Sequence, residues 1–460
     1  MIKRWIIYAL LLSLIFSCFI PVVSADEAQT AVGCKGMDAS DPYLGKVQLV
    51  ENVSAAFLYE RNSDSLLYAW NADSQQFPAS LVKIMTALLV IENASLEDEI
   101  LVSQESVDSI PGDAISVDLQ AGELITVQDL LYCLMVKSAN DAAVVLAEHI
   151  AGSQSAFVTM MNARAEELGC TGTNYVNVHG LHDDAQVTTA RDTCRILDAA
   201  LNFEFFRTIF GTAHYKVEAT NLSEERLIST NNFFINGESV AIYQDERVTG
   251  GRTGVTADGF RCIASVAENR NMEVICIVMG SASTFLDSGA TDVYGGFPET
   301  IALYNLGFGG NDTRQILFEN QIVRQQKVIN GDSDVFVACR EGYSAVLPSD
   351  YESDDLQYIF EDAPGSGEAP IEKDQHMGKL KVMHGTVCIA EIELYAANKV
   401  PLKVYKSASY IDPEGNSNFW IWILVIVILL VGGAAGFLVF RKRKRNRKNQ
   451  SKLEWRREEL

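Results

Sequence analysis

The sequence has few of the residues that hold metal ions, and their spacing does not suit a site. It contains six His in 460 residues, and they show no ligand spacing. Its nine Cys form no Cys-x-x-Cys pair and no paired Cys/His pattern. Structural zinc sites need closely spaced ligands of this kind. The sequence therefore predicts no metal site and no other cofactor.

Positive charge is also scarce, and it is unevenly distributed along the chain. The formal net charge is -23, yet residues 441–460 hold ten Lys or Arg against three Asp or Glu. The long segment before this tail is therefore more acidic than the total suggests. A strongly acidic surface repels phosphate backbones, so we expect no nucleic-acid partner.

The first 25 residues have the form of a secretory signal peptide. Lys3 and Arg4 precede an apolar stretch from Trp5 to Val23, and small residues end at Ala25. This pattern predicts cleavage after Ala25. Cys18 raises the alternative of a lipoprotein, but Phe16 stands where a lipidation signal has a small or β-branched residue. We interpret Cys18 as part of the discarded signal.

A second apolar run lies near the C-terminus. Phe419–Phe440 contains 22 residues without a charge, enough at 1.5 Å per residue to cross a hydrocarbon core of about 30 Å. The basic run 441–448 follows directly. A basic cluster beside a span is typical of a cytoplasmic flank, which we favour over a nucleic-acid site. The tail is thus expected in the cytoplasm, and residues 26–417 outside.

Eight cysteines remain in the mature chain, and an extracytoplasmic compartment permits disulfides without demanding them. Several lie in apolar runs, such as Cys133 in 130–136 and Cys276 in 274–279. A free Cys in such a run behaves as a small buried hydrophobe, and we favour that interpretation. The eight are Cys34, Cys133, Cys170, Cys194, Cys262, Cys276, Cys339 and Cys388.

The segment between the signal and the span is too long for one core, so we expect two folded units. The first mixes helical segments with a β-hairpin, in which 262–267 and 272–279 flank a turn at 268–271. The second has short alternating runs, for example 333–338, 357–361 and 378–395, and is expected to be all-β. The expected boundaries are signal 1–25, linker 26–45, α+β domain 46–312, β domain 313–406, linker 407–418, transmembrane helix 419–440 and tail 441–460.

Ser80 and Lys83 form the first candidate catalytic element. Almost every residue from Leu81 to Ile91 is apolar, which predicts a helix buried on all sides, and Lys83 is the only charge in this run. Burial disfavours the charged form of Lys83, so its amine becomes a plausible general base. Ser80 lies one helical turn earlier, within reach of that amine. The pattern is weak by chance alone, but this is the only Ser-x-x-Lys in the chain.

Ser138 and Asn140 form the second element. They lie between a predicted apolar helix over 127–137 and another that starts near Asp141 and ends before Gly152. Ser229-Thr230-Asn231 also matches Ser-x-Asn, but it does not lie between two buried helices. We therefore favour the first match as the functional one.

The third element is the glycine-rich segment 250–256, directly before the hairpin. Its glycines would let a substrate backbone approach a strand edge. Arg252, Thr253 and nearby backbone N–H groups are able to bind a carboxylate. An ordinary glycine-rich turn with a surface Arg would look the same, so this element gains weight only beside the other two.

The three elements, taken in order, resemble the signature motifs of penicillin-binding proteins and serine β-lactamases. The segments 77–87, 138–152 and 177–183 are similar to those of the low-molecular-mass D-alanyl-D-alanine carboxypeptidases. This resemblance covers roughly residues 45–310. It implies a β-lactamase/transpeptidase-like α+β domain, an antiparallel sheet flanked by helices with a helical subdomain, followed by the β domain and the span. In this family the segment holding His179 and His182 is structural.

The resemblance also implies a mechanism and its partners. Ser80 would attack the penultimate D-Ala carbonyl, Lys83 would take its proton, and Ser138 would relay it to the leaving D-Ala. The N–H groups of Ser80 and Val255 would form the oxyanion hole. Asn140 would hold the substrate amide and Lys83. Peptidoglycan stem peptides would be the substrates and β-lactams the covalent inhibitors.

The carboxylate of the substrate would be bound by Arg252 and Thr253, with Gly254 also among the substrate-binding residues. Here the sequence departs from the family, which usually has Lys-Thr-Gly. Arginine keeps the charge but cannot release a proton, so a proton-shuttling role does not carry over. Two other functions remain. A β-lactamase uses the same motifs, but no Glu-bearing deacylation loop of the class A kind is found. A non-catalytic sensor is supported only by Arg252, and a 20-residue tail leaves no room for a signalling domain.

Overall fold

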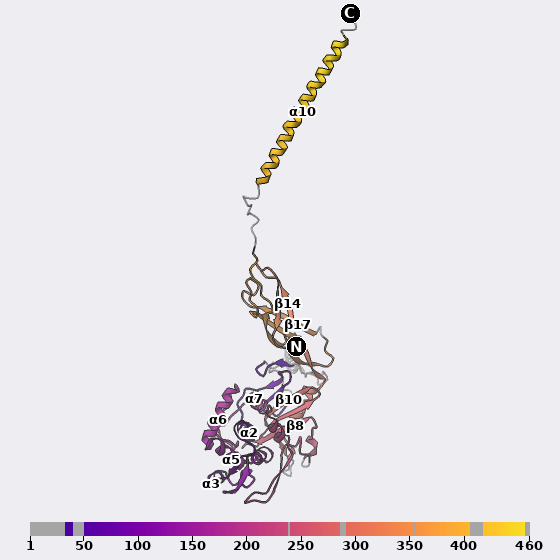
Figure 1. Ribbon diagram of the computed structural model, residues 1–460. Helices are drawn as coiled ribbons and strands as arrows, with labels where there is room; N and C mark the ends of the chain where they lie inside the picture. Colours follow the sequence, from indigo (N-terminus) through magenta and orange to yellow (C-terminus); the bar gives the residue numbers. More distant parts are fainter. Residues whose placement is uncertain are drawn as a thin grey trace, which may run out of the picture.

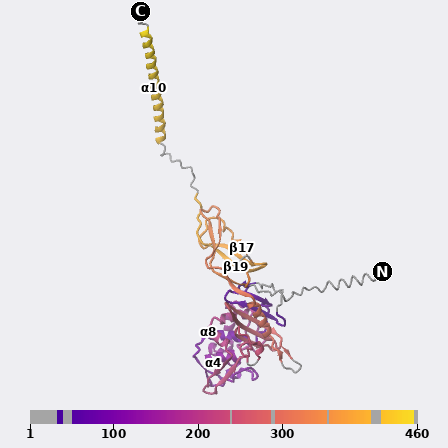
Figure 2. The ribbon, with the colours of Figure 1, turned by 90° about the vertical axis from the view of Figure 1, so that its right-hand side faces the viewer.

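The computed structural model describes residues 33–39, 50–237, 240–285, 291–352, 355–404 and 417–455. The expected signal peptide and most of both expected linkers lie outside these residues. A body of helices and a sheet is followed by an all-β domain and then by a long helix (Figure 1). In the view turned by 90°, strands β17 (Leu356–Asp362) and β19 (Val387–Ala396) of the β domain lie between the first body and helix α10 (Ser417–Trp455) (Figure 2). Helices α4 (Val127–Tyr132) and α8 (Glu204–Phe210) mark the first body in this view.

A six-stranded antiparallel sheet forms the centre of the first body, in the order β1-β3-β2-β10-β9-β8. Its strands are β1 (Cys34–Lys35), β2 (Ala55–Glu60), β3 (Ser65–Trp70), β8 (Val248–Val255), β9 (Arg261–Asn269) and β10 (Met272–Ser281). The order leaves β8 at one edge, and β8 carries the third sequence element. The expected hairpin is confirmed as β9 and β10. Its turn is shorter than expected, because the ladder continues to Asn269 and Met272 and leaves only Arg270 and Asn271 between the strands.

Both faces of the sheet are covered by other elements, because alternate side chains of β2 belong to two different hydrophobic cores. Ala55, Phe57 and Tyr59 belong to the core shared with the helices on one side. Ala56 and Leu58 belong to a second core on the other face. Because successive side chains of a strand point to opposite faces, an uninterrupted apolar strand must be covered on both sides.

Most of the helices contribute side chains to the first of these two cores. They are α2 (Val82–Asn93), α3 (Gln104–Asp108), α4 (Val127–Tyr132), the π-helical turn η2 (Cys133–Lys137), α5 (Asn140–Ala151), α6 (Gln154–Glu167), α7 (Ala190–Ala200) and α8 (Glu204–Phe210). Helix α9 (Phe297–Phe308) covers the opposite face with Phe297, Leu303 and Tyr304. Residues 82–90 of α2 are all buried, which confirms the expected central helix.

Short elements complete this body at its periphery. They are the 3-10 turns η1 (Ala79–Leu81) and η3 (Ala241–Tyr243) and the strand pairs β4 (Glu99–Leu101) with β5 (Leu124–Thr126), β6 (His214–Val217) with β7 (Arg226–Ser229), and β11 (Thr284–Phe285) with β12 (Thr291–Val293).

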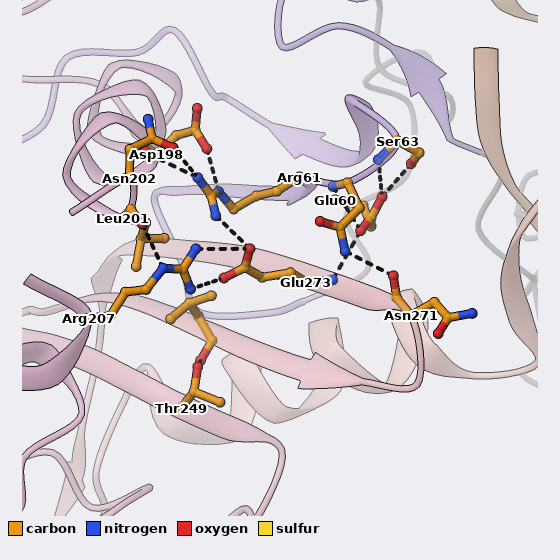
Figure 3. A network of polar contacts seen from close by, with 12 residues as sticks. Glu60, Arg61, Ser63, Asp198, Leu201, Asn202, Arg207, Thr249, Asn271 and Glu273 are labelled. Carbon is orange, nitrogen blue, oxygen red and sulfur yellow. Dashed lines mark hydrogen bonds and ion pairs between the residues drawn. The ribbon is translucent and has the colours of Figure 1, made fainter. Parts of the chain in front are cut away.

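A network of charged side chains ties α7 and α8 to the sheet (Figure 3). Arg61, just after β2, pairs with Asp198 of α7 and with Glu273 of β10. Glu273 also pairs with Arg207 of α8. The carboxylate of Glu60 is fully buried and accepts hydrogen bonds from the N–H groups of Asn62, Ser63 and Glu273. Positive and negative groups alternate from Asp198 through Arg61 and Glu273 to Arg207, while the Glu60 carboxylate is satisfied by N–H donors instead.

The β domain has a core of its own, built from residues between Leu317 and Val400. A five-stranded sheet, β14-β15-β19-β18-β17, lies beside the pair β13-β16. The expected run 378–395 is in fact two strands, because Gly385 lies in the left-handed region and reverses the chain between His384 and Val387. The strands are β13 (Asn311–Leu317), β14 (Ile322–Gln326), β15 (Val335–Cys339), β16 (Tyr343–Pro348), β17 (Leu356–Asp362), β18 (His376–His384) and β19 (Val387–Ala396).

Helix α10 (Ser417–Trp455) contains the second apolar run. Its segment Ile421–Lys444 is long and apolar enough to cross a membrane, with a mean hydropathy of 3.0. The helix continues through the basic residues that follow. Elsewhere, the eight cysteines among the described residues are free thiols. Seven of them are buried, as expected, and Cys388 is partly exposed.

Candidate active site

Ser80 lies in the short turn η1, in front of helix α2. Ala79 before it has a φ of 47°, in the left-handed region that side chains with a Cβ rarely adopt. Two glycines let other segments approach this turn. A Cβ on Gly180 would lie 2.1 Å from the carbonyl oxygen of Ala79, and one on Gly254 would lie 2.7 Å from the amide nitrogen of Ser80. Ser80 is thus held between strand β8 and the segment that contains Gly180.

Lys83 is fully buried in the first turn of α2. Its Nζ donates to Oδ1 of Asn140 at 2.8 Å and to the backbone carbonyl of His179. Burial holds the pKa of Lys83 well below its usual value, and the nearby charge of Arg252 lowers this pKa further. Asp141 acts in the opposite direction. The lysine therefore favours the neutral amine that a general base requires.

Ser138 is the C-cap residue at the end of the helix that the sequence predicts over 127–137. The last turn of that helix, η2, is a π-helix, and Ser138 follows it with a φ of 72°. Single π turns are frequent at functional sites because they redirect the residues that follow. Here Ser138 is 2% exposed, and its Oγ donates to Oγ of Ser80 at 3.2 Å.

Asn140 is the first residue of α5, whereas the sequence predicts a helix from Asp141. Its backbone N–H and its Nδ2 both donate to the carbonyl of Ile115, and its Oδ1 faces Lys83. Asp141 next to it accepts from the N–H groups of Val117 and Leu119. The start of α5 therefore holds the loop 113–119 against the site.

The hydrogen bonds at Ser80 differ from the expected pairing. In the part of the chain that the structure describes, no hydrogen bond joins Ser80 to Lys83. The hydroxyl of Ser80 instead accepts from Ser138, while the Lys83 amine is bound by Asn140 and His179. The sequence had no signal for His179 in this role, because the group that binds Lys83 is its backbone carbonyl.

Arg252 lies behind the site rather than in its wall, contrary to the expected contact with a substrate carboxylate. It is 1% exposed, and burial lowers its pKa to about 10. Its Nη1 donates to the carbonyl of Met135 at 3.0 Å, and its Nε to the carbonyl of Ser80 at 3.5 Å. Its Nη2 is buried without a hydrogen-bond partner among the described residues. The guanidinium thus bridges the turn of Ser80 and the helix that ends at Ser138.

Thr253 points the other way from Arg252, as neighbours on a strand do. Its Oγ1 donates to Oδ1 of Asn231 at 2.7 Å. Asn231 belongs to the second Ser-x-Asn match, which does not lie between two buried helices, and the structure brings it to the same site. The signal was present in the sequence, but only the fold places it opposite Thr253.

These residues surround an open cleft with an empty volume of about 880 Å³. Ser80 and Ser138 line the cleft, while Lys83 and Arg252 are buried behind its wall. The lining residues are Ser80, Asp113, Ala114, Ile115, Ser138, Asn140, His179, Gly180, Leu181, His182, Asn231, Thr253, Gly254, Val255, Thr256 and Ala257.

A serine at the mouth of a cleft, a buried lysine three residues later and a second serine against the first define a serine acyl-transfer site. Comparison with known proteins identifies the family. A family model described as D-alanyl-D-alanine carboxypeptidase matches residues 47–283, and one described as the C-terminal domain of penicillin-binding protein 5 matches residues 312–402.

The chain belongs to the D-alanyl-D-alanine carboxypeptidase family. It is 28% identical over 350 residues to the D-alanyl-D-alanine carboxypeptidase DacF of Bacillus subtilis, which covers 75% of this chain and 85% of that protein. It is 27% identical to DacA of Haemophilus influenzae, over 80% of this chain and 91% of the relative. The solved structure of penicillin binding protein 5 from Haemophilus influenzae aligns with a TM-score of 0.62 at 25% identity, over 76% of this chain and 98% of that one.

Proposed function

We propose that this chain is a serine-type D-alanyl-D-alanine carboxypeptidase, which removes the terminal D-Ala from peptidoglycan stem peptides through an acyl-enzyme. The observation that carries the proposal is the contact between the Ser80 and Ser138 hydroxyls beside a fully buried Lys83. Family membership supports the same reaction. The predicted covalent inhibitors are β-lactams, which would acylate Ser80 in place of the peptide.

Acylation begins with attack of Ser80 Oγ on the carbonyl carbon of the penultimate D-Ala. Neutral Lys83 takes the hydroxyl proton as the new C–O bond forms. The C–N bond to the terminal D-Ala then breaks, and Ser138 relays the proton from Lys83 to the leaving nitrogen, which returns Lys83 to its neutral form. Water attacks the resulting ester, which frees the shortened peptide and restores Ser80.

The substrate carbonyl needs donors at the point where negative charge develops. We assign this role to the backbone N–H groups of Ser80 and Val255, since Gly254 lets strand β8 approach the Ser80 amide. β8 also lies at one edge of the sheet. An extended peptide lying along β8 would form main-chain hydrogen bonds with it. Asn140 and Thr253 line the same cleft and would contact this peptide.

Arg252 contributes by position and charge. Its bonds to the carbonyls of Ser80 and Met135 hold the nucleophile's turn against the segment that carries Ser138. Its buried charge favours the neutral form of Lys83. Neither effect requires a proton to leave the guanidinium, so replacement of the family's usual lysine is compatible with activity.

The organisation of the chain suits an enzyme of the cell wall. We propose that cleavage after Ala25 releases the mature protein and that the segment 419–440 anchors it. The catalytic domain 46–312 and the β domain 313–406 would then lie outside the membrane, with the tail 441–460 in the cytoplasm. The apolar helix and the basic residues after it support this orientation.

One experiment tests the proposed function. The purified protein is incubated with a stem pentapeptide, and released D-Ala is measured beside covalent labelling by fluorescent penicillin. An enzyme gives both signals. Labelling without release of D-Ala would favour a penicillin-binding sensor, and rapid turnover of the penicillin itself would favour a β-lactamase.

A further inference from the structure

Among the residues that the structure describes, no Lys or Arg side chain lines the cleft. Among its 16 lining residues the ionisable ones are Asp113, His179 and His182. Burial and the charge of Lys83 lower the pKa of His179 to about 4, so its ring is neutral at pH 7. A free carboxylate entering this cleft therefore finds no Lys or Arg side chain to contact.

Three cationic side chains lie in or directly beside the sequence motifs, and none of them lines the cleft. Lys83 is fully buried and donates to Asn140 and His179. Arg252 is 1% exposed and donates to backbone carbonyls. Lys137 directly precedes Ser138 and is exposed, but it does not line the cleft.

The pair formed by Thr253 and Asn231 occupies the wall in which a carboxylate contact was expected. The Thr253 hydroxyl donates its proton to Oδ1 of Asn231, at 2.7 Å. The hydroxyl can then only accept further hydrogen bonds. The Nδ2 group of exposed Asn231 is consequently the donor that this pair offers to a substrate. An amide N–H is able to donate to a carboxylate, a carboxamide or an ester oxygen.

We propose that Asn231 makes this cleft tolerant of uncharged C-termini, so that acyl-D-Ala-D-alanine amides and esters are substrates beside the free acid. The proposal rests on the proposed function. A hydrogen bond with one ionised partner is roughly twice as strong as one between neutral groups, so the free acid keeps a modest advantage, but no Lys or Arg side chain adds the attraction of a second charge. Hydrolysis of the amide substrate follows the same steps. Ser80 forms the ester, the C–N bond breaks, D-alaninamide leaves with a proton, and water completes the reaction.

The test compares two substrates that differ only at the C-terminus: diacetyl-L-Lys-D-Ala-D-Ala and its C-terminal carboxamide. The kcat/KM of each is measured on the full-length protein in detergent. In the wild type we expect the acid to be preferred by less than about tenfold, the scale of one neutral hydrogen bond. A preference above about a hundredfold would overturn the proposal, whatever any variant does.

Two variants identify the residue responsible. Asn231→Arg adds a cation beside Thr253 and should raise the preference for the acid at least tenfold, mainly through a lower KM for the acid. Lys137→Gln is the matched control and should leave the preference unchanged. A drop in preference in Lys137→Gln, or no change in an Asn231→Arg protein that still labels with penicillin, would overturn the assignment to Asn231.

If Asn231→Arg fails to fold, the ratio of the two kcat/KM values in the wild type still tests whether the cleft accepts an uncharged C-terminus. Asn231→Leu then tests whether Asn231 is the residue responsible. Removal of the shared amide donor should reduce kcat/KM for both substrates by a similar factor. A loss confined to the acid would contradict the proposal. If the wild type cleaves neither substrate, the proposed function itself fails, an outcome separate from a strong preference for the acid.

Discussion

Nζ of Lys83 donates to Oδ1 of Asn140 at 2.8 Å, across the boundary between helices α2 and α5. A second hydrogen bond runs from the same nitrogen to the carbonyl of His179. A neutral amine has two N–H groups and one lone pair, so these two acceptors use both of its hydrogens. The lone pair remains free to take the proton of Ser80. Asn140 and His179 thus orient the base as well as bind it.

Replacement of the nucleophile should abolish both reactions of the site. In Ser80→Ala, we expect neither covalent penicillin labelling nor release of D-Ala, because the hydroxyl that forms the ester is absent. Mass spectrometry of the penicillin-treated protein is the measurement. Ser155→Ala, on the exposed side of α6, is the control and should label fully. A penicilloyl adduct on any other residue would contradict the assignment of Ser80.

Arg252 should control the pH at which Lys83 becomes active. Its charge lowers the pKa of Lys83, so Arg252→Gln should raise that pKa and move the acid limb of the kcat/KM profile to higher pH. Arg252→Lys keeps the charge but cannot reach both backbone carbonyls as a fork does. We expect an unshifted limb and a loss of kcat/KM below about tenfold, roughly 1.4 kcal/mol.

The same pair of variants tests the alternative functions. A rise of roughly a hundredfold in turnover in Arg252→Lys would mean that the position normally shuttles protons, since this is the scale of a gained general acid or base. If the wild type labels with penicillin but releases no D-Ala, and only the Arg252→Lys variant releases D-Ala, the protein would be a sensor. An equal shift of the acid limb in both variants would show that charge is not what Arg252 supplies.

His179 should make the fold less stable in mild acid. Burial lowers its pKa from 6.5 to about 4, and its Nδ1 accepts a hydrogen bond from the N–H of Leu181. Between these two values the unfolded chain binds a proton that the folded chain does not. The free energy of unfolding therefore falls as the pH drops from 6.5 to 4, by at most about 3 kcal/mol from this group.

A pair of His variants separates the destabilising effect of His179 from that of carboxylates that titrate in the same pH range. The thermal midpoint is measured at pH 7 and pH 4.5 for the wild type, for His179→Gln and for His149→Gln, a partly exposed histidine on α5. The pH-dependent drop should be smaller in His179→Gln than in the other two proteins. An equal drop in all three would rule out His179 as the cause.

Removal of the last helix should separate attachment from chemistry. Deletion of residues 418–460 removes nearly all of α10, whereas the site residues lie between Ser80 and Ala257. We expect a secreted, soluble protein with unchanged D-Ala release. Fractionation of cells that express the truncated chain is the measurement. Retention in the membrane fraction would contradict either the predicted span or the predicted signal cleavage.

Sequence alone determined the chemical elements of the site and the family to which they point. Ser80, Lys83, Ser138 and Asn140 could be predicted because their spacing and the apolar runs around them are local features. The α+β class, the hairpin and the β domain followed from periodicity in the same way. Turn positions could not be predicted in the same way, as Gly385 shows, because one residue in the left-handed region can divide a run that alternates along its whole length.

Only the tertiary structure decided which groups face one another across the cleft. Arg252 and Thr253 are neighbours in sequence, yet one is buried behind Ser80 and the other faces Asn231, because alternate residues of β8 point to opposite sides. The carbonyl of His179 reaches Lys83 from 96 residues away through a backbone group that has no signature in a sequence. The composition of the cleft wall, and hence its lack of a cation, depends on the direction of each side chain, which the fold sets and the sequence pattern does not reveal.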